Sequence, residues 1–233
     1  MSIGASSAGD GKLFDIELAP GSGGGITVNR DIQATEGIIG TLVLAADGAG
    51  NIKTGINTLT AANVGLSTGS GNINGNIAAT NVTAFTAGNV NLEALHSVTV
   101  GPSAAGGDFN LRTRAGSGGS ITVSGDITGG TITLASDGAG GISRAAGTLT
   151  ATQVNLSADS FGVIGAGTGN IGAAAAGTQV FTAAGTVKVN TNGSVFVRQT
   201  GNVVLDPSGS NAGDAQTFSL ATSPASNVRT ASR

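Results

Sequence analysis

The chain has 233 residues and a formal net charge of −3, and only 10% of its residues are charged, against about 25% in average proteins. Gly occurs 41 times, whereas Cys, Trp and Tyr are absent. Because Gly, Thr, Val and Asn are poor helix formers, this composition excludes a helical bundle. Without Cys there are no disulfides or thiolate metal sites, and the weakly acidic balance provides no basic patch for nucleic acid.

Two further classes are excluded by hydrophobicity. Hydrophobic residues make up 39% of the chain, which together with the low net charge argues against disorder. No apolar run approaches the roughly 20 residues of a membrane-spanning helix, so we expect no membrane insertion.

In chain order, short runs of alternating apolar and polar residues predict strands with one buried face. The first half of the chain has such runs at 26–28, 42–44, 64–66, 90–92 and 98–100. The second half has them at 121–123, 132–134, 154–156 and 187–189. Clusters of Gly, Asn, Asp and Ser separate the runs and predict turns, and no helical pattern lies between them.

A longer repeat of about 95 residues also runs through the chain twice, in the same order. Residues 21–32 match 116–127 at an offset of 95, and residues 40–52 match 130–142 at an offset of 90. The tripeptide Phe85-Thr-Ala recurs 96 residues later, at Phe181. Such regular repetition of short strands is the sequence signature of a solenoid.

The alternation slips at the same place in both copies. Residues 59–61 are followed by the run at 64–66, and residues 149–151 are followed by the run at 154–156. One extra residue turns the buried face, as a corner between two sheets requires. Three short strands then make one turn of roughly 20–25 residues, which predicts about ten turns.

These patterns predict an all-β fold, a right-handed parallel β-helix. The alternative is an antiparallel β-sandwich, which also consists of many strands but normally longer ones with more aromatic residues. We expect an irregular segment at 1–13, the β-helix at 14–205, with copies at about 14–108 and 109–205, and an irregular cap or tail at 206–233.

The core is predicted from the inward positions of the alternating runs. We expect the following residues to be buried: Ile26, Val28, Leu42, Leu44, Leu59, Leu66, Val90, Leu92, Ile121, Val123, Ile132, Leu134, Leu149, Leu156, Val187 and Val189. We also expect the seven phenylalanines to fill the interior: Phe14, Phe85, Phe109, Phe161, Phe181, Phe196 and Phe218.

Asparagine at the turns predicts amide ladders, in which side chains stacked from turn to turn hydrogen-bond along the solenoid. The residues concerned are Asn51, Asn72, Asn74, Asn76 and Asn81.

Candidate catalytic groups are few. Asp15 and Glu17 alternate on one strand face, but the second copy carries Asn110 and Arg112 at the equivalent positions, so the carboxylate pair does not recur. A solvated strand face is the better interpretation. His96 is the single histidine, and a general base or metal ligand needs partners that the sequence does not offer. We interpret it as a loop or corner residue.

Two Gly-rich motifs are also interpreted as turns. Asp-Gly-Ala-Gly at 47–50 and 137–140 supplies too few oxygen ligands for calcium. Gly-Ser-Gly-Gly-Gly at 21–25 lacks the Lys and helix of a phosphate-binding loop. We therefore predict no catalytic residues, no cofactor and no metal site.

Several of these motifs together resemble a known family. Gly-Thr-Leu-Thr-Ala with Val-Asn-Leu-Ser (147–157), the Gly-Asn-Ile steps at 50–52, 71–73 and 169–171, and Gly-Asn-Val-Asn-Leu (88–92) are similar to filamentous-haemagglutinin-type exoproteins. The resemblance covers about residues 14 to 205. Those proteins are large β-helical adhesins of Gram-negative bacteria, typically exported by two-partner secretion, and the family's amino-terminal secretion domain is not evident here.

The resemblance implies a stalk segment of a secreted cell-surface adhesin, cut from a longer chain and involved in adhesion or in contacts within surface fibres and biofilms. Its expected partners are a glycan or protein receptor on a host or bacterial surface and an outer-membrane secretion partner. Independently of the resemblance, the open ends of a solenoid expose unpaired strand edges, so we expect either capping by neighbouring repeats of the parent chain or further copies stacked end to end. The alternative function is a carbohydrate-binding or polysaccharide-cleaving β-helix.

Overall fold

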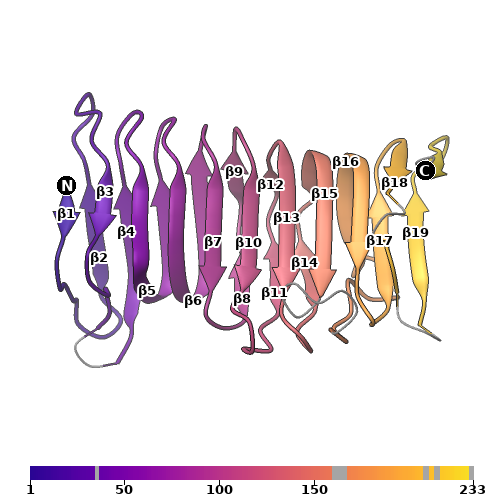
Figure 1. The fold of residues 1–233 in the computed structure, drawn as a ribbon, viewed down its shortest axis with the longest axis horizontal. Helices are drawn as coiled ribbons and strands as arrows, with labels where there is room; N and C mark the ends of the chain where they lie inside the picture. The colour runs from indigo at the N-terminus through magenta and orange to yellow at the C-terminus, as the bar shows by residue number, and fades with distance from the viewer. Residues whose placement is uncertain (35–36, 159–166, 207–209, 213–215, 231–233) are drawn as a thin grey trace.

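The computed structural model describes residues 1–34, 37–158, 167–206, 210–212 and 216–230. All regular secondary structure in these ranges is β-strand. The strands belong to one sheet, and the named strands pair with one another in parallel. The sheet winds into a β-solenoid of about ten turns, with the two chain ends at opposite ends of the rod (Figure 1). The predicted fold class is confirmed, and the antiparallel sandwich is excluded because the pairings are parallel.

The strands of the first half are β1 (Ser2–Ile3), β2 (Leu13–Glu17), β3 (Ile26–Val28), β4 (Ile39–Ala45), β5 (Ile52–Ser67), β6 (Ile73–Thr86), β7 (Val90–Ala94), β8 (Val98–Val100), β9 (Ser103–Ala105) and β10 (Phe109–Thr113). Those of the second half are β11 (Ile121–Ser124), β12 (Ile127–Thr128), β13 (Thr131–Ser136), β14 (Ile142–Ala146), β15 (Leu149–Ala158), β16 (Val180–Asn190), β17 (Val195–Gln199), β18 (Val203–Leu205), β19 (Phe218–Thr222) and β20 (Val228–Thr230).

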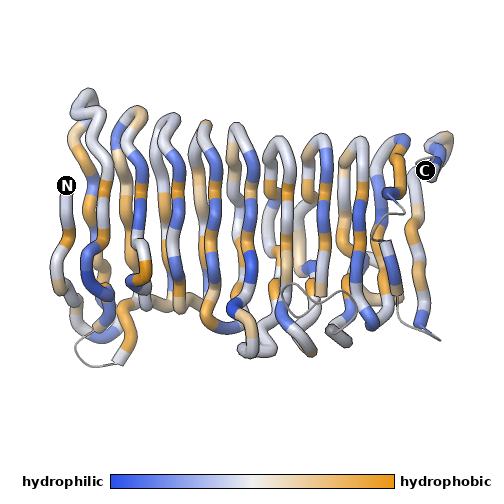
Figure 2. Tube along the Cα trace, viewed as in Figure 1, coloured by the Kyte–Doolittle hydropathy of each residue, from blue (hydrophilic) through white to orange (hydrophobic). Residues whose placement is uncertain are grey.

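The core is a narrow column of aliphatic side chains inside the solenoid. All sixteen residues predicted to be inward-facing are buried. Apolar and polar residues alternate along many of the strands, and the apolar positions line up from one turn to the next (Figure 2). The predicted phase slip also occurs: within β5, Leu59 and Ala61 are buried, two outward residues follow, and Val64 and Leu66 are buried again.

The prediction that the phenylalanines fill the interior is wrong for most of them. Phe109 is fully buried, whereas Phe85 and Phe218 are exposed and Phe14, Phe181 and Phe196 are partly exposed. Phe161 lies outside the described residues. In both Phe-Thr-Ala matches the threonine faces inward instead. Thr86 and Thr182 are buried, and each satisfies its hydroxyl with a hydrogen bond, to the Gly71 carbonyl and to Gln199 respectively.

Phe181 is stabilised outside the core by arginines. The Arg144 guanidinium carbon lies 3.7 Å from the centre of its ring, and that of Arg198 lies 5.4 Å away. A cation over an aromatic face is attracted by the ring's electrons, and the guanidinium also shields the ring from water.

The Gly-Asn-Ile steps form the corners of the solenoid, and each residue type has a separate task there. The glycines at 50, 71 and 169 lie against the backbone of the preceding turn, so that an added Cβ would overlap a carbonyl group. The asparagine carboxamide accepts a hydrogen bond from the backbone of the next turn, as from Asn72 N to Asn51 Oδ1 at 2.7 Å. The isoleucine is the first buried residue of the following strand or bridge.

The predicted Asn ladders are confirmed in two forms, but the predicted turn position is wrong for Asn74, Asn76 and Asn81, which lie within β6. Asn51 and Asn72 bond to the backbone of the next turn, and Asn76 Nδ2 donates to the Gly55 carbonyl. Asn81 and Asn74 take part in direct amide–amide bonds between neighbouring turns. The ladders therefore tie successive turns together outside the core as the aliphatic column does inside it.

The two sequence copies do not lie above one another in the solenoid. Leu42 and Ile132 match in the sequence repeat and have matching neighbours: Leu42 lies between Phe14 and Val64, and Ile132 lies between Phe109 and Val154. The stack that contains Leu42 continues from Val64 through Val82 and Val100 to Val123, and not to Ile132. From Phe109 the pairing runs through Val90 and Ile73 to Ile52, on the next face of the solenoid. The second copy is thus rotated by one face about the long axis.

The prediction of irregular ends is wrong for three segments. β1 pairs in parallel with β3, β19 with β17, and β20 with β18. These strands satisfy backbone groups that the adjoining turns would otherwise leave unpaired. Residues 207–209, 213–215 and 231–233 of the predicted tail lie outside the described residues.

Candidate functional site

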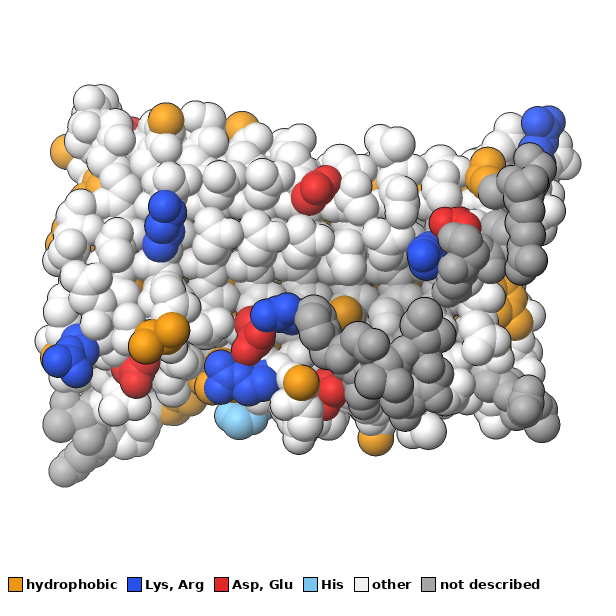
Figure 3. All heavy atoms as spheres, viewed as in Figure 1, with side chains coloured by type: hydrophobic (Ala, Val, Ile, Leu, Met, Phe, Trp, Pro, Cys, Tyr) orange, Lys and Arg blue, Asp and Glu red, His pale blue; other side chains and the backbone are white. Residues whose placement is uncertain are grey.

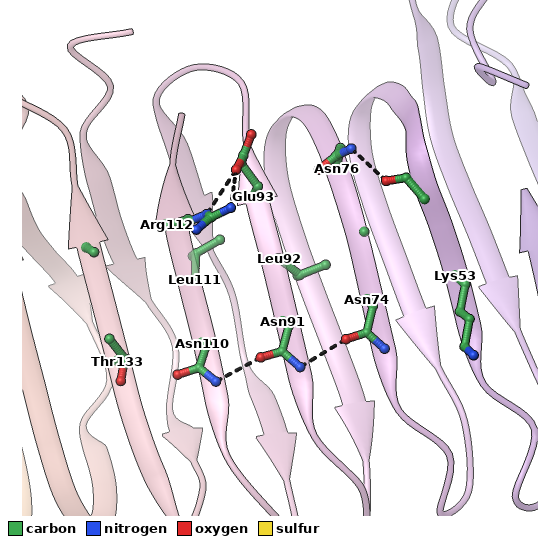
Figure 4. Close-up of a pocket in the computed structure, with 13 residues that line it drawn as sticks. Lys53, Asn74, Asn76, Asn91, Leu92, Glu93, Asn110, Leu111, Arg112 and Thr133 are labelled. Atoms are coloured by element: carbon green, nitrogen blue, oxygen red, sulfur yellow. Dashed lines mark hydrogen bonds and ion pairs between the residues drawn. The ribbon is translucent and has the colours of Figure 1, made fainter. Parts of the chain in front are cut away.

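A groove of about 660 Å³ lies across strands β5, β6, β7, β10 and β13, which follow one another on one face of the solenoid. Its lining residues are Lys53, Gly55, Asn74, Gly75, Asn76, Asn91, Leu92, Glu93, Asn110, Leu111, Arg112, Thr133 and Ala135. The neighbouring strands bring these residues together in register, because Asn74 pairs with Asn91 and Asn91 with Asn110. Figure 4 shows the polar side chains standing in two rows across the strands.

The first row is an amide ladder of Asn74, Asn91 and Asn110. Asn91 Nδ2 donates to Asn74 Oδ1 at 3.0 Å, and Asn110 Nδ2 donates to Asn91 Oδ1 at 2.9 Å (Figure 4). Neighbouring strands are about 4.8 Å apart, a spacing that allows such bonds between equivalent side chains. A carboxamide has two N–H donors and two acceptor lone pairs, so the ladder leaves hydrogen-bonding capacity facing the groove.

The second row contains an ion-pair cluster. Arg112 Nη2 lies 2.6 Å from Glu93 Oε2, and Arg114 Nε lies 2.9 Å from Glu93 Oε1. The hydrogen bond from Arg114, assisted by that from Arg112, holds the pKa of Glu93 below its ordinary value, against partial burial that raises it. Glu93 is therefore a carboxylate at neutral pH, and two cations neutralise it.

The groove also has an apolar component. Gly75 pairs with Leu92, and Leu92 and Leu111 line the groove although both are buried in the core. An added Cβ at Gly75 would lie 3.0 Å from Cγ2 of the buried Thr54 and 3.8 Å from Leu92 Cδ2, so Gly75 faces the interior as well. Since Leu92 and Leu111 are only 3% and 1% exposed, the groove offers a ligand mainly its polar groups, with amides on one side and charged groups on the other.

The carboxylates considered from sequence lie elsewhere. Asp15 and Glu17 are exposed on β2, as expected for a solvated strand face. Asp47 Oδ2 accepts a hydrogen bond from Gly23 N at 2.8 Å, and Asp137 Oδ2 accepts one from Gly118 N at 3.1 Å. Both Asp-Gly-Ala-Gly motifs are therefore turns that bind the preceding turn of the solenoid.

His96 is exposed at a corner, and the Gly119 backbone packs against it, as the corner interpretation predicted. Within the described ranges, no group of three or more His, Cys, Asp or Glu side chains could hold a metal ion. The same ranges contain no helix long and apolar enough to cross a membrane.

Sequence reasoning missed the groove. Asn110 and Arg112 were considered only as evidence that the Asp15–Glu17 pair does not recur, and Glu93 was not singled out. The available signal was the recurrence of an apolar residue followed by Asn at 73–74, 90–91 and 109–110. These steps are separated by 17 and 19 residues, shorter than the 21 residues between Asn51 and Asn72, so they do not stand out as one period.

The arrangement can bind polar ligands but lacks the groups for acid–base hydrolysis. Among the described residues, Glu93 is the one carboxylate that lines the groove, whereas glycoside hydrolysis normally needs two, one of them with a raised pKa. Figure 3 shows that charged side chains are sparse on this face of the rod and that acidic and basic groups touch near its middle.

Comparisons with protein-family models, curated proteins and solved structures found no match to this chain.

Proposed function

We propose that this chain is a structural stalk segment of a secreted bacterial surface adhesin, which carries adhesive or fibre-forming contacts along an elongated rod. The observation that carries the proposal is that the features repeated in both sequence copies serve to stack turns. Asp31 Oδ1 accepts a hydrogen bond from Thr58 N, and its repeat partner Asp126 accepts one from Thr148 N. A rod built in this way can be lengthened by further turns without a change in design.

Groups that could perform chemistry are not repeated. His96, Glu93 and the arginines beside Glu93 each occur in one copy. Since Glu93 is held as a neutralised carboxylate, it is a poor general acid at neutral pH. We therefore propose a binding and structural role in place of catalysis.

The proposed location and export follow from the resemblance to filamentous-haemagglutinin-type exoproteins. On that basis the chain acts at the cell surface, and an outer-membrane secretion partner exports the parent protein. A chain without Cys is compatible with passage through the membrane in an unfolded form.

Two measurements test this function. Small-angle scattering should give the pair-distance distribution of a rod, and beads coated with the protein should adhere to bacterial or host cells more than beads coated with the heat-unfolded chain. A compact particle, or equal adhesion by folded and unfolded chains, would contradict the proposal. A polysaccharide-cleaving activity of the purified protein that the Glu93→Gln variant loses would replace it with the enzymatic alternative.

A further inference from the structure

We infer that the groove over β6, β7 and β10 binds a linear polysaccharide that carries carboxylate groups, laid along the axis of the rod. This inference rests on the proposed adhesive function, for which it names a site and a ligand class. It draws on three properties of the groove: its charge, its hydrogen-bonding groups, and the spacing of its cations along the rod.

The charge of the groove is opposite to that of the whole protein. The chain has a net charge of −3, whereas the charged lining residues are Lys53, Arg112 and Glu93, two cations and one anion. Arg114, beside the lining, adds a further cation to the Glu93 cluster. Asp108 precedes β10 and is not part of the lining; its Oδ1 accepts a hydrogen bond from Thr131 N. The local excess of positive charge favours an anionic ligand.

The hydrogen-bonding groups suit sugars. Each amide of the Asn74–Asn91–Asn110 ladder retains both donor and acceptor capacity, as hydroxyl groups require.

Two other kinds of polymer, an extended peptide and a nucleic acid, do not suit the groove. An extended peptide binds a sheet through an open strand edge, but the backbone groups of β6, β7 and β10 already pair with neighbouring turns. Nucleic acid requires a denser line of cations than Lys53 and Arg112 provide. These two residues lie three strand spacings apart, about 14 Å along the axis, with neutral amides between them. A polymer with carboxylates spaced along its length matches that pattern.

Calorimetric titration of the purified chain with an oligogalacturonate, beside a neutral cello-oligosaccharide of equal length, tests the inference. The oligogalacturonate should bind more tightly, and added salt should weaken its binding, because exposed charges are screened. Lys53→Gln should weaken its affinity by about two- to fivefold, as expected for loss of an exposed ion pair.

The matched control is Lys188→Gln. Lys188 pairs with Asn155, which pairs with Thr133, so it lies in the row of the amide ladder but beyond the groove. This variant should bind as the wild type does. Asn91→Ala, with its melting temperature measured alongside, should also weaken binding because it removes the middle amide of the ladder.

Absence of oligogalacturonate binding, equal binding of the neutral sugar, or equal effects of the two lysine variants would each overturn the inference. If the chain scatters as a rod and adheres to cells but ignores the oligogalacturonate, the inference fails while the proposed function stands. If the rod shape or the adhesion is absent, the proposed function fails, whatever the groove binds.

Discussion

The hydroxyl of Thr182 donates a hydrogen bond to the side-chain oxygen of Gln199 at 2.6 Å inside the core of the solenoid. Gln199 is only 1% exposed, and its carboxamide also accepts from Ala184 N and donates to the carbonyls of Ala184 and Thr200. The buried carboxamide of Gln199 is tolerated because its N–H groups and its oxygen all have hydrogen-bond partners.

Gln199→Met should destabilise the fold, because it leaves Thr182 and Ala184 without this partner at a cost of about 1–3 kcal/mol for each stranded group. Urea unfolding followed by circular dichroism measures the loss. Adding Thr182→Val should recover part of it, because the unsatisfied hydroxyl is then removed. If the double variant is no more stable than the single one, the hydroxyl is not a source of the destabilisation.

Leu134→Asp should lower the free energy of unfolding by several kcal/mol, because Leu134 is fully buried and the carboxylate would be desolvated without a partner. The same change at the neighbouring outward residue, Thr133→Asp, should cost less than about 1 kcal/mol. Thermal unfolding of both variants checks the predicted face of β13. Equal melting temperatures would show that the strand register is wrong.

Gly140→Ala should destabilise the protein by about 1–3 kcal/mol, as overpacking does elsewhere. The new Cβ would overlap the Gly119 carbonyl of the preceding turn, and a paired backbone moves less readily than a side chain. Gly4→Ala is the matched control, because nothing lies within 4 Å of its Cβ position. Chemical unfolding that fails to separate the two variants would argue against close stacking at the corners.

The ion pairs of Glu93 should make stability depend on pH in the acid range. Because the folded-state pKa is lowered from 4.5, the contribution is present above that value and is lost as pH falls through the folded-state pKa. The wild type should exceed Glu93→Gln by at most about 1 kcal/mol at neutral pH, since the cluster is partly exposed and screened by solvent.

Unfolding curves at several pH values measure this difference, which should shrink in acid. Glu17→Gln, a change at an exposed position on β2, serves as the control and should show a smaller difference from the wild type at every pH. A Glu93 difference that stays constant down to strongly acidic pH would mean that the ion pairs do not stabilise the fold.

The sequence by itself determined the fold class, the strand positions and the core, because these depend on local patterns. A two-residue alternation decides which side chains of a strand share a face, whatever lies on the neighbouring turn. Ile26, Leu44 and Leu134 were therefore placed inside correctly. Asp47, Asn51 and Asn72 were placed outside the strands correctly, because Asp and Asn accept the dihedral angles of turns.

Only the tertiary structure decided which turn lies on which. The length of a turn varies, from 17 residues between Asn74 and Asn91 to 33 between Leu149 and Thr182. These differences accumulate along the chain, so the second copy ends up rotated by one face. Equivalent residues keep equivalent neighbours, as Leu42 and Ile132 do, but the two sets belong to different stacks. The groove arises from the same variation, because two short turns bring Asn74, Asn91 and Asn110 into one row and place Glu93 beside Arg112.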